Sequence, residues 1–218
     1  MNNLLSKFQE ICNDNITLPD GGDIKINKLN VDFQSKLHTR LENSENDFVA
    51  ILTYMDYINE YITGLYRDYN FTYRDKLYIL NYWFQDIHSL DNFNLNTKAI
   101  DKLNDSKIEL QLNNNNIVVK LQQSNLQLEN KILQFLLSKP PKSIGRMSII
   151  FFDTCRFIHS VEIDGQEFFI ENMSVEEFYK IYELFSVDHL KQITDKLTEI
   201  LQELSIIREL EADITSFY

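Results

Sequence analysis

The chain has 218 residues, of which 44% are hydrophobic and 25% charged, so its composition is that of a folded globular protein and excludes disorder as the main state. Its 33 acidic and 21 basic side chains give a net charge of −12. A charge of this sign repels nucleic-acid phosphates and anionic lipid headgroups, which argues against a nucleic-acid or membrane-surface binder. With only five glycines and three prolines, helix should dominate.

The N-terminal region predicts two helices and a strand. Residues 1–11 carry apolar side chains at helical spacing, and the turn Leu18-Pro19-Asp20-Gly21-Gly22 ends this helix. Residues 23–29 alternate apolar and polar side chains, which is typical of a half-buried strand. A further helix is expected over residues 33–41.

Two capping signatures predict the longest helices. Ser44-Glu45-Asn46-Asp47 precedes an apolar stripe over residues 48–62, and Gly64 is expected to end that helix. Thr72-Tyr73-Arg74-Asp75 repeats the signature and begins a helix that continues to Ile87. We expect these two helices to pack against each other as a hairpin.

The middle of the chain predicts a short helix, a β-hairpin and a longer helix. The short helix covers residues 97–103. Residues 108–112 and 117–121 have strand patterns and are joined by four asparagines, which tolerate the positive φ angles of tight turns. Ser124-Asn125-Leu126-Gln127 begins the longer helix, and Lys139-Pro140-Pro141 ends it.

The remaining residues predict a second hairpin and C-terminal helices. Residues 147–158 are apolar enough for a buried helix or a strand, and periodicity leaves both open. Residues 159–170 read as two strands around Asp164-Gly165, a strong hairpin signal. Ser174-Val175-Glu176-Glu177 is a fourth capping signature, after which the pattern is helical with a break near Ser186.

These elements predict an α+β fold that is predominantly helical, with two small β-hairpin or strand units. Pro140-Pro141 is the best candidate for a boundary between residues 1–139, a helical region with a strand and a hairpin, and residues 140–218, a hairpin followed by acidic helices. One continuous domain is the alternative. Residues 171–218 hold 11 acidic and 4 basic side chains, which concentrates the negative charge there.

No local pattern indicates a catalytic or metal site. Four histidines lie in different predicted elements with no i,i+4 pair among them: His38, His88, His159 and His189. Cys12 and Cys155 are far apart and are interpreted as reduced thiols. The acidic pair Glu176-Glu177 fits the first turn of a capped helix, where carboxylates oppose the helix dipole. We therefore expect no enzyme activity, no cofactor and no metal.

The start of the chain does not resemble a secretory signal peptide, because Lys7 and Glu10 interrupt its apolar residues. No run of residues approaches the roughly 18 apolar side chains that a membrane-spanning helix needs. From these features we expect the protein to remain in the cytoplasm where it is made, without a membrane partner.

Aromatic side chains concentrate on the two long predicted helices. The simplest interpretation is that these side chains lie in the core and at its edge. Base stacking would also need a basic groove, which Arg67, Arg74 and Lys76 alone do not make. Helices this rich in tyrosine carry more aromatic surface than one internal face can hide, which favours a protein interface. The residues predicted to contact a partner are Tyr57, Tyr61, Tyr82 and Trp83.

The order of several segments resembles a known family. These segments are the Leu18–Gly22 turn with the strand at Ile24-Lys25-Ile26, the helix over 46–63, the block Phe71-Thr72-Tyr73-Arg74-Asp75-Lys76-Leu77-Tyr78-Ile79-Leu80, the strand over 117–121, and the hairpin over 157–165 followed by helices. The pattern spans about residues 16–204 and is similar to that of the baseplate hub assembly proteins of T-even-type contractile-tailed phages, the bacteriophage base plate protein family.

This resemblance implies a non-enzymatic subunit or assembly factor of a phage tail baseplate hub. Such a protein acts through contacts with other hub or tail proteins, in the host cytoplasm during assembly or in the virion tail baseplate, and in an oligomer. The family brings no catalytic residues to this chain.

Two other functions stay open. The first alternative is a small acidic regulatory protein that binds one host protein through its C-terminal helices from Ser186 onward. An unrecognised enzyme comes third. A truncation at Leu184 separates the leading ideas, because a regulator should lose its partner and stay folded, whereas a tail that belongs to the core should make the whole chain unstable.

Overall fold

The computed structural model describes residues 7, 13–88, 97–112 and 115–202. Within these residues eight α-helices accompany one antiparallel sheet of two strands and one of four. The predicted α+β fold, predominantly helical with two small β units, is confirmed. The helix expected over residues 1–11 and the apolar repeat beyond Leu204 lie outside the described residues.

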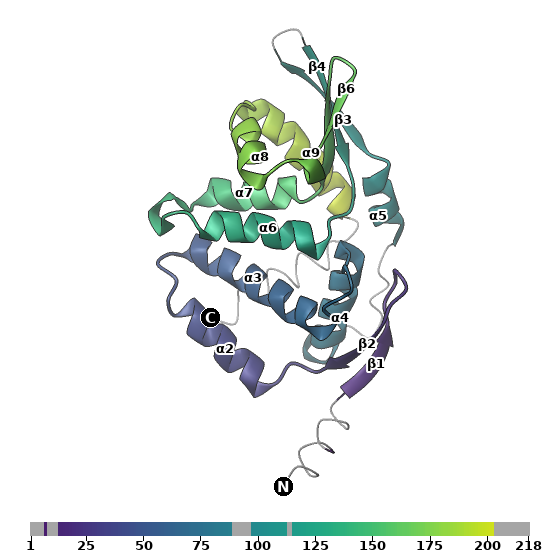
Figure 1. The fold of residues 1–218 in the computed structure, drawn as a ribbon, viewed down its shortest axis with the longest axis vertical. Helices are drawn as coiled ribbons and strands as arrows, with labels where there is room; N and C mark the ends of the chain where they lie inside the picture. Colours follow the sequence, from purple (N-terminus) through teal and green to yellow (C-terminus); the bar gives the residue numbers. More distant parts are fainter. Residues whose placement is uncertain (1–6, 8–12, 89–96, 113–114, 203–218) are drawn as a thin grey trace.

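The helices and strands follow one another as in Figure 1. The helices are α2 (Val31–Leu41), α3 (Asp47–Leu65), α4 (Tyr73–His88), α5 (Thr97–Asn104), α6 (Leu126–Leu137), α7 (Arg146–Cys155), α8 (Val175–Tyr182) and α9 (Val187–Gln202). The strands are β1 (Asn13–Thr17), β2 (Asp23–Asn27), β3 (Lys107–Leu112), β4 (Asn115–Leu121), β5 (Ile158–Ile163) and β6 (Gln166–Phe169). Two 3₁₀ turns, η1 (Pro141–Ser143) and η2 (Ile170–Asn172), complete the set.

The small sheet is a hairpin of β1 and β2 closed by the turn at Leu18–Gly22. The Leu18 N–H donates to the Gly22 carbonyl at 2.7 Å, and Gly21 has a φ of +102°, which favours glycine. The sequence predicted β2 but not β1, because Asn13, Asp14 and Asn15 are poor strand formers. These residues become a strand because β2 pairs with them along its whole length.

The larger sheet has the order β3-β4-β5-β6, with every neighbouring pair antiparallel. The hairpin predicted at Asp164-Gly165 is confirmed, with φ values of +51° and +82° that suit a tight two-residue turn. Strands β4 and β5 pair although α6 and α7 lie between them in sequence. The sheet therefore joins segments on both sides of Pro140-Pro141.

Two predicted helix caps are confirmed by reciprocal hydrogen bonds. At α4 the Thr72 N–H donates to the Asp75 carboxylate at 3.1 Å, and the Asp75 N–H donates to the Thr72 hydroxyl at 3.2 Å. At α8 the Ser174 N–H donates to the Glu177 carboxylate at 3.0 Å, and the Glu177 N–H donates back to the Ser174 hydroxyl.

Two other helices begin one or two residues later than predicted. The cap of α3 is Asn46, whose side chain accepts from the Val49 N–H at 2.9 Å. The cap of α6 is Asn125, whose side chain accepts from the Leu128 N–H at 2.9 Å. Asparagine competes with serine as a cap, and a sequence that holds both within one or two residues does not settle which one is used.

The segment that periodicity left open contains both kinds of structure, since α7 ends at Cys155 and β5 begins at Ile158. Helix α3 packs most closely along α6, and it also contacts α4 in the second core, where the rings of Tyr61 and Trp83 lie 5.6 Å apart. The expected contact between α3 and α4 is therefore present, but α6 is the main partner of α3. Helices α4 and α6 begin side by side. The Leu126 N–H donates to the Phe71 carbonyl at 2.9 Å, which fixes both helix starts.

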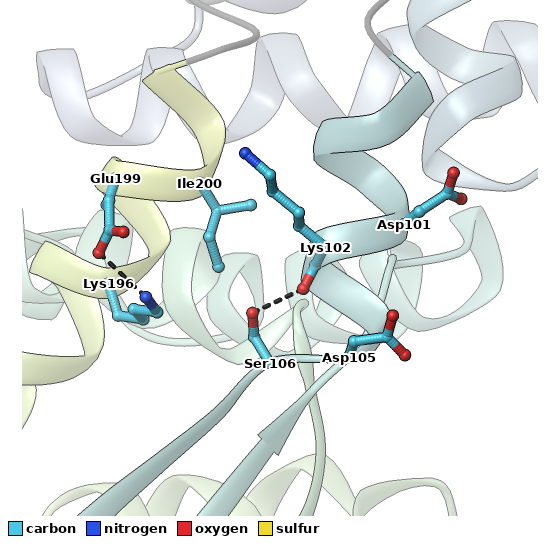
Figure 2. A pocket seen from close by; sticks show the side chains of 7 residues that line it. All are labelled: Asp101, Lys102, Asp105, Ser106, Lys196, Glu199 and Ile200. Atoms are coloured by element: carbon cyan, nitrogen blue, oxygen red, sulfur yellow. Dashed lines mark hydrogen bonds and ion pairs between the residues drawn. The ribbon is translucent and has the colours of Figure 1, made fainter.

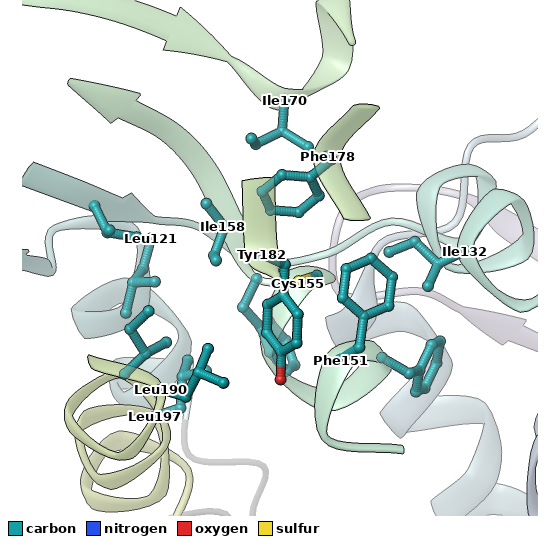
Figure 3. Packing of buried hydrophobic residues seen from close by; sticks show 14 of the residues in the cluster. Leu121, Ile132, Phe151, Cys155, Ile158, Ile170, Phe178, Tyr182, Leu190 and Leu197 are labelled. Atoms are coloured by element: carbon teal, nitrogen blue, oxygen red, sulfur yellow. The ribbon is translucent and has the colours of Figure 1, made fainter. Parts of the chain in front are cut away.

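The main core lies between the larger sheet and α6, α7, α8 and α9 (Figure 3). Phe151 of α7 is fully buried at its centre, and its ring lies edge-on to Tyr179 and Tyr182 at centroid distances of 4.8 and 4.9 Å. Helix α9 contributes five buried side chains: Leu190, Ile193, Leu197, Ile200 and Leu201. This core therefore includes residues from both sides of Pro140-Pro141.

A second core lies below α3 and is made by β2, α2, α3 and α4. Ile26, Phe33, Ile62 and Leu80 are each at most 3% exposed within it. Because α4 contributes to both cores, through Leu77 to the first and residues 79–83 to the second, it is central to the fold.

Replacing Leu80 with Ala should lower the free energy of unfolding by about 2 to 5 kcal/mol, because the site is 2% exposed and the cavity left behind adds to the lost burial. Urea unfolding followed by circular dichroism measures this change. Leu184→Ala is the matched control, since Leu184 is 73% exposed and should change stability by less than about 0.5 kcal/mol. A loss at Leu80 no larger than at Leu184 would show that α4 is peripheral.

Candidate functional site

Two sequence blocks that carry the family resemblance, the Leu18–Gly22 turn and the start of α4, are joined by hydrogen bonds. The Thr72 hydroxyl donates to the Asp20 carboxylate at 2.5 Å, and the Asp20 N–H donates to the Asp75 carboxylate at 3.3 Å. Since 52 residues separate Asp20 from Thr72, the junction exists only in the folded chain. We refer to these residues as the turn–helix junction.

Asp75 is the buried centre of the junction, with 0% of its surface exposed. Besides the amides of Thr72 and Asp20, its carboxylate accepts from the Tyr69 hydroxyl at 3.1 Å. Three donors from two segments of the chain therefore satisfy one carboxylate, which offsets the cost of its burial.

Tyr69 closes the junction from the other side. Burial, followed by the nearby Asp75 charge, raises the pKa of Tyr69 to about 12, so the phenol stays protonated and donates. Gly22 packs against its ring, and a Cβ at that position would lie 2.9 Å from Cε2 of Tyr69. The second glycine of the turn is thus required by the close approach of the ring.

Arg74 extends the junction toward α5. Its guanidinium lies 3.3 Å from the Asp20 carboxylate and 2.9 Å from the Asp101 carboxylate. Arg74 is 16% exposed and Asp101 is 62% exposed, so the ion pairs lie at the surface and lead from the β1–β2 turn to α5.

A shallow depression of about 470 Å³ begins at Asp101 and lies between α5, the start of β3 and α9 (Figure 2). Its lining residues are Asp101, Lys102, Asp105, Ser106, Lys196, Glu199 and Ile200. Lys196 and Glu199 already pair at 3.0 Å, and the Ser106 hydroxyl donates to the Lys102 carbonyl at 2.6 Å. With both signs of charge present, this surface suits a polar contact with another protein better than an anion or cation site.

A buried ionic cluster lies deeper in the molecule and was not predicted from the sequence. Glu129 of α6 is 0% exposed, and its carboxylate lies 2.8 Å from Nζ of Lys76 and 3.5 Å from the guanidinium of Arg156. The side-chain amide of Asn59 donates to the same carboxylate at 3.0 Å. Four segments of the chain therefore meet at one carboxylate.

Arg156 is also surrounded by aromatic rings. Its guanidinium carbon lies 4.8 Å from the ring centroids of Phe152 and Phe157 and 5.2 Å from that of Tyr73. Such cation–π contacts stabilise a cation that burial would otherwise disfavour. They complement the ion pair with Glu129.

Burial alone would raise the pKa of Glu129, but the neighbouring Lys76 and Arg156 charges hold it below its ordinary value of 4.5. The carboxylate is therefore charged in the folded protein. Because its pKa is lower in the folded than in the unfolded state, its contribution to stability is present above pH 4.5 and is lost as the pH falls below that value.

The sequence does contain a signal for this cluster. Leu126, Glu129 and Ile132 occupy one face of α6 at spacings of three residues, so a charged side chain interrupts an inward apolar stripe. A charge at such a position needs a buried partner. The local pattern does not identify Lys76, Asn59 or Arg156 as those partners.

The four predicted contact residues lie together between α2, α3, α4 and the β1–β2 hairpin, but two of them are interior. Tyr57 and Trp83 are 5% and 4% exposed, and the Trp83 N–H donates to the Asn27 carbonyl at 3.0 Å. Their prediction as surface contacts is corrected, because α2 and the hairpin cover them. Tyr61 and Tyr82 are half-buried and remain at the surface.

Tyr61 and Tyr82 are themselves fixed by neighbours in this fold. The Tyr61 ring lies 4.9 Å from that of Phe33 and 5.6 Å from that of Trp83, and the Tyr82 hydroxyl donates to the Asp14 carboxylate. Only their outer faces are therefore available to a partner.

Histidine and acidic side chains do not gather into a metal site anywhere among the described residues. His189 binds the Gln111 carbonyl through Nε2 at 2.9 Å, and His159 lies edge-on to the ring of Phe169. Cys155 is buried, which raises the pKa of its thiol well above the ordinary value.

No protein-family model, curated protein or solved structure matches this chain. Among the described residues, no helix has both the length and the apolar character needed to cross a membrane.

Asp75→Asn should lower the free energy of unfolding by about 1.5 to 3 kcal/mol, because the amide presents a donor to a group of donors and loses the charge that strengthens these hydrogen bonds. Chemical denaturation measures this loss. Asp32→Asn is the control, since Asp32 is 66% exposed in its pair with Lys36 and should contribute less than about 1 kcal/mol. Equal effects of the two substitutions would show that the junction does not stabilise the fold.

Proposed function

We propose that this protein is a non-enzymatic subunit or assembly factor of a contractile phage tail baseplate hub, acting through contacts with other hub or tail proteins. The proposal rests on the order of segments along the chain. One structural observation supports it, namely the contact between two of the segments that define the resemblance.

That contact is the turn–helix junction. In a sequence pattern of loose residue classes, segments far apart in the chain could match independently and have no relation in space. Here Asp20 from the first segment and Thr72 and Asp75 from the second share hydrogen bonds around one buried carboxylate. These two segments of the pattern therefore form one structural unit in this chain, which supports the proposal.

The surface next to the junction is suited to protein contacts. Arg74 and Asp101 connect the junction to the mixed-charge depression between α5 and α9, and the outer faces of Tyr61 and Tyr82 lie on the second core. Polar rims with accessible tyrosine are typical of protein interfaces. These are the surfaces through which hub or tail proteins would be bound.

Deletion of the gene from the phage that carries it should leave heads without complete contractile tails, because a hub that cannot assemble does not initiate a tail. Electron microscopy of lysates measures this outcome, and expression of the wild-type chain from a plasmid should restore tails. Mass spectrometry of purified particles then distinguishes a hub subunit from an assembly factor that leaves.

Normal tails in the deletion strain would contradict the proposal. So would a gene located far from any tail genes in a host without a prophage. Either result would favour the alternative, an acidic regulator of one host protein.

One feature of the fold bears on that alternative. Helix α9 supplies five buried side chains to the main core, so residues 187–202 are not a detachable binding arm. A regulator built on this fold would have to use the outer surface of α8 and α9 while their inner faces remain packed.

A further inference from the structure

The turn between α8 and α9 exposes two large aliphatic side chains. Leu184 is 73% exposed and Val187 is 81% exposed. Among the large hydrophobic side chains that the structure describes, only Val31 on α2 is comparably exposed, at 80%. Exposed apolar side chains that lie together mark binding surfaces more often than single ones such as Val31, which are common.

Hydrogen bonds hold this turn in place. The Ser186 N–H donates to Nδ1 of His189 at 3.3 Å, and the His189 N–H donates to the Ser186 hydroxyl at 3.2 Å. Because Nδ1 accepts, Nε2 carries the proton and donates to the Gln111 carbonyl at 2.9 Å. The turn is thereby attached to the end of β3.

Three apolar side chains close to the exposed pair in sequence point inward. Tyr182 and Leu190 are buried in the main core, and Phe185 packs against it from the middle of the turn. With these three side chains fixed in the core, Leu184 and Val187 face solvent in the folded chain. A partner would therefore meet a preorganised apolar surface and would lose little conformational entropy of the turn on binding.

Charges beside the pair restrict what can bind. The neighbouring side chains Glu183 and Asp188 are exposed, one on each side of the apolar pair in sequence. Residues 171–202 hold seven acidic and three basic side chains. A second copy of this chain would bring the same acidic surface into contact with itself, and like charges across an interface oppose association.

We propose that Leu184 and Val187 are the apolar anchors of a docking site for a basic amphipathic helix of a partner protein. The leucine-type face of that helix covers the two aliphatic side chains, and its lysine or arginine residues pair with Glu183 and Asp188 at the rim. Burial of the anchors supplies most of the affinity, and the rim charges supply selectivity and salt dependence. This inference does not depend on the baseplate proposal.

A defined peptide tests the site directly. The probe is an 18-residue, end-labelled helical peptide with leucines on one face and lysines on the other, and fluorescence anisotropy measures its affinity for the full chain. We expect the double variant Leu184→Ser/Val187→Ser to bind at least tenfold more weakly than the wild type. A peptide with glutamate in place of every lysine should not bind.

Val31→Ser is the matched control, because it removes the same kind of side chain at the same exposure from another helix. It should bind the peptide as the wild type does. Glu183→Lys/Asp188→Lys tests the rim charges separately and should also weaken binding. Circular dichroism spectra identical to that of the wild type verify that each variant is folded.

Three results would overturn the proposal. The first is a wild-type chain that does not bind the basic peptide. The second is equal affinity of the Leu184→Ser/Val187→Ser variant and the wild type, which would place the peptide elsewhere. The third is a wild-type dimer in sedimentation that the double variant abolishes, which would make a second copy the occupant. None of these results alters the expected phenotype of the gene deletion.

Discussion

One interaction constrains how the helices are placed, the burial of the Glu129 carboxylate between Lys76 and Arg156. Removing charges from water costs several kcal/mol per ion, and only close, well-oriented partners offset that cost. Here the partners come from α4 and from the residue that follows α7, and Asn59 of α3 adds a hydrogen bond. Three helices and the end of α7 therefore have to be positioned together for the carboxylate to be satisfied.

The cluster also explains how the two apolar cores form one molecule. On α4, Leu77 packs in the main core and Leu80 packs in the second, while Lys76 on the same helix binds Glu129. On α3, Leu52 and Ile58 are divided between the cores in the same way. The ionic cluster thus lies among residues of both cores, and removing it should destabilise both.

Local sequence patterns predicted those parts of the fold that a few adjacent residues determine. The Asp164-Gly165 hairpin and the Thr72–Asp75 cap are set by the conformations of adjacent residues. The same reasoning did not predict β1, because its pairing comes from β2, nor the burial of Trp83, because the covering hairpin is distant in sequence. The partners of Glu129 and the turn–helix junction depend on contacts more than 25 residues apart, which periodicity cannot reveal.

Unfolding of the Glu129→Gln variant in urea tests the coupling of the two cores most directly. Fluorescence of Trp83, the single tryptophan, reports on the second core, and hydrogen exchange of α9 amides reports on the main core. The account predicts that both reporters lose about 3 to 5 kcal/mol together, because Lys76 loses its buried counter-ion and Arg156 keeps only the partly exposed Asp153 carboxylate at 3.4 Å. A loss of stability in α9 with an unchanged Trp83 transition would contradict it.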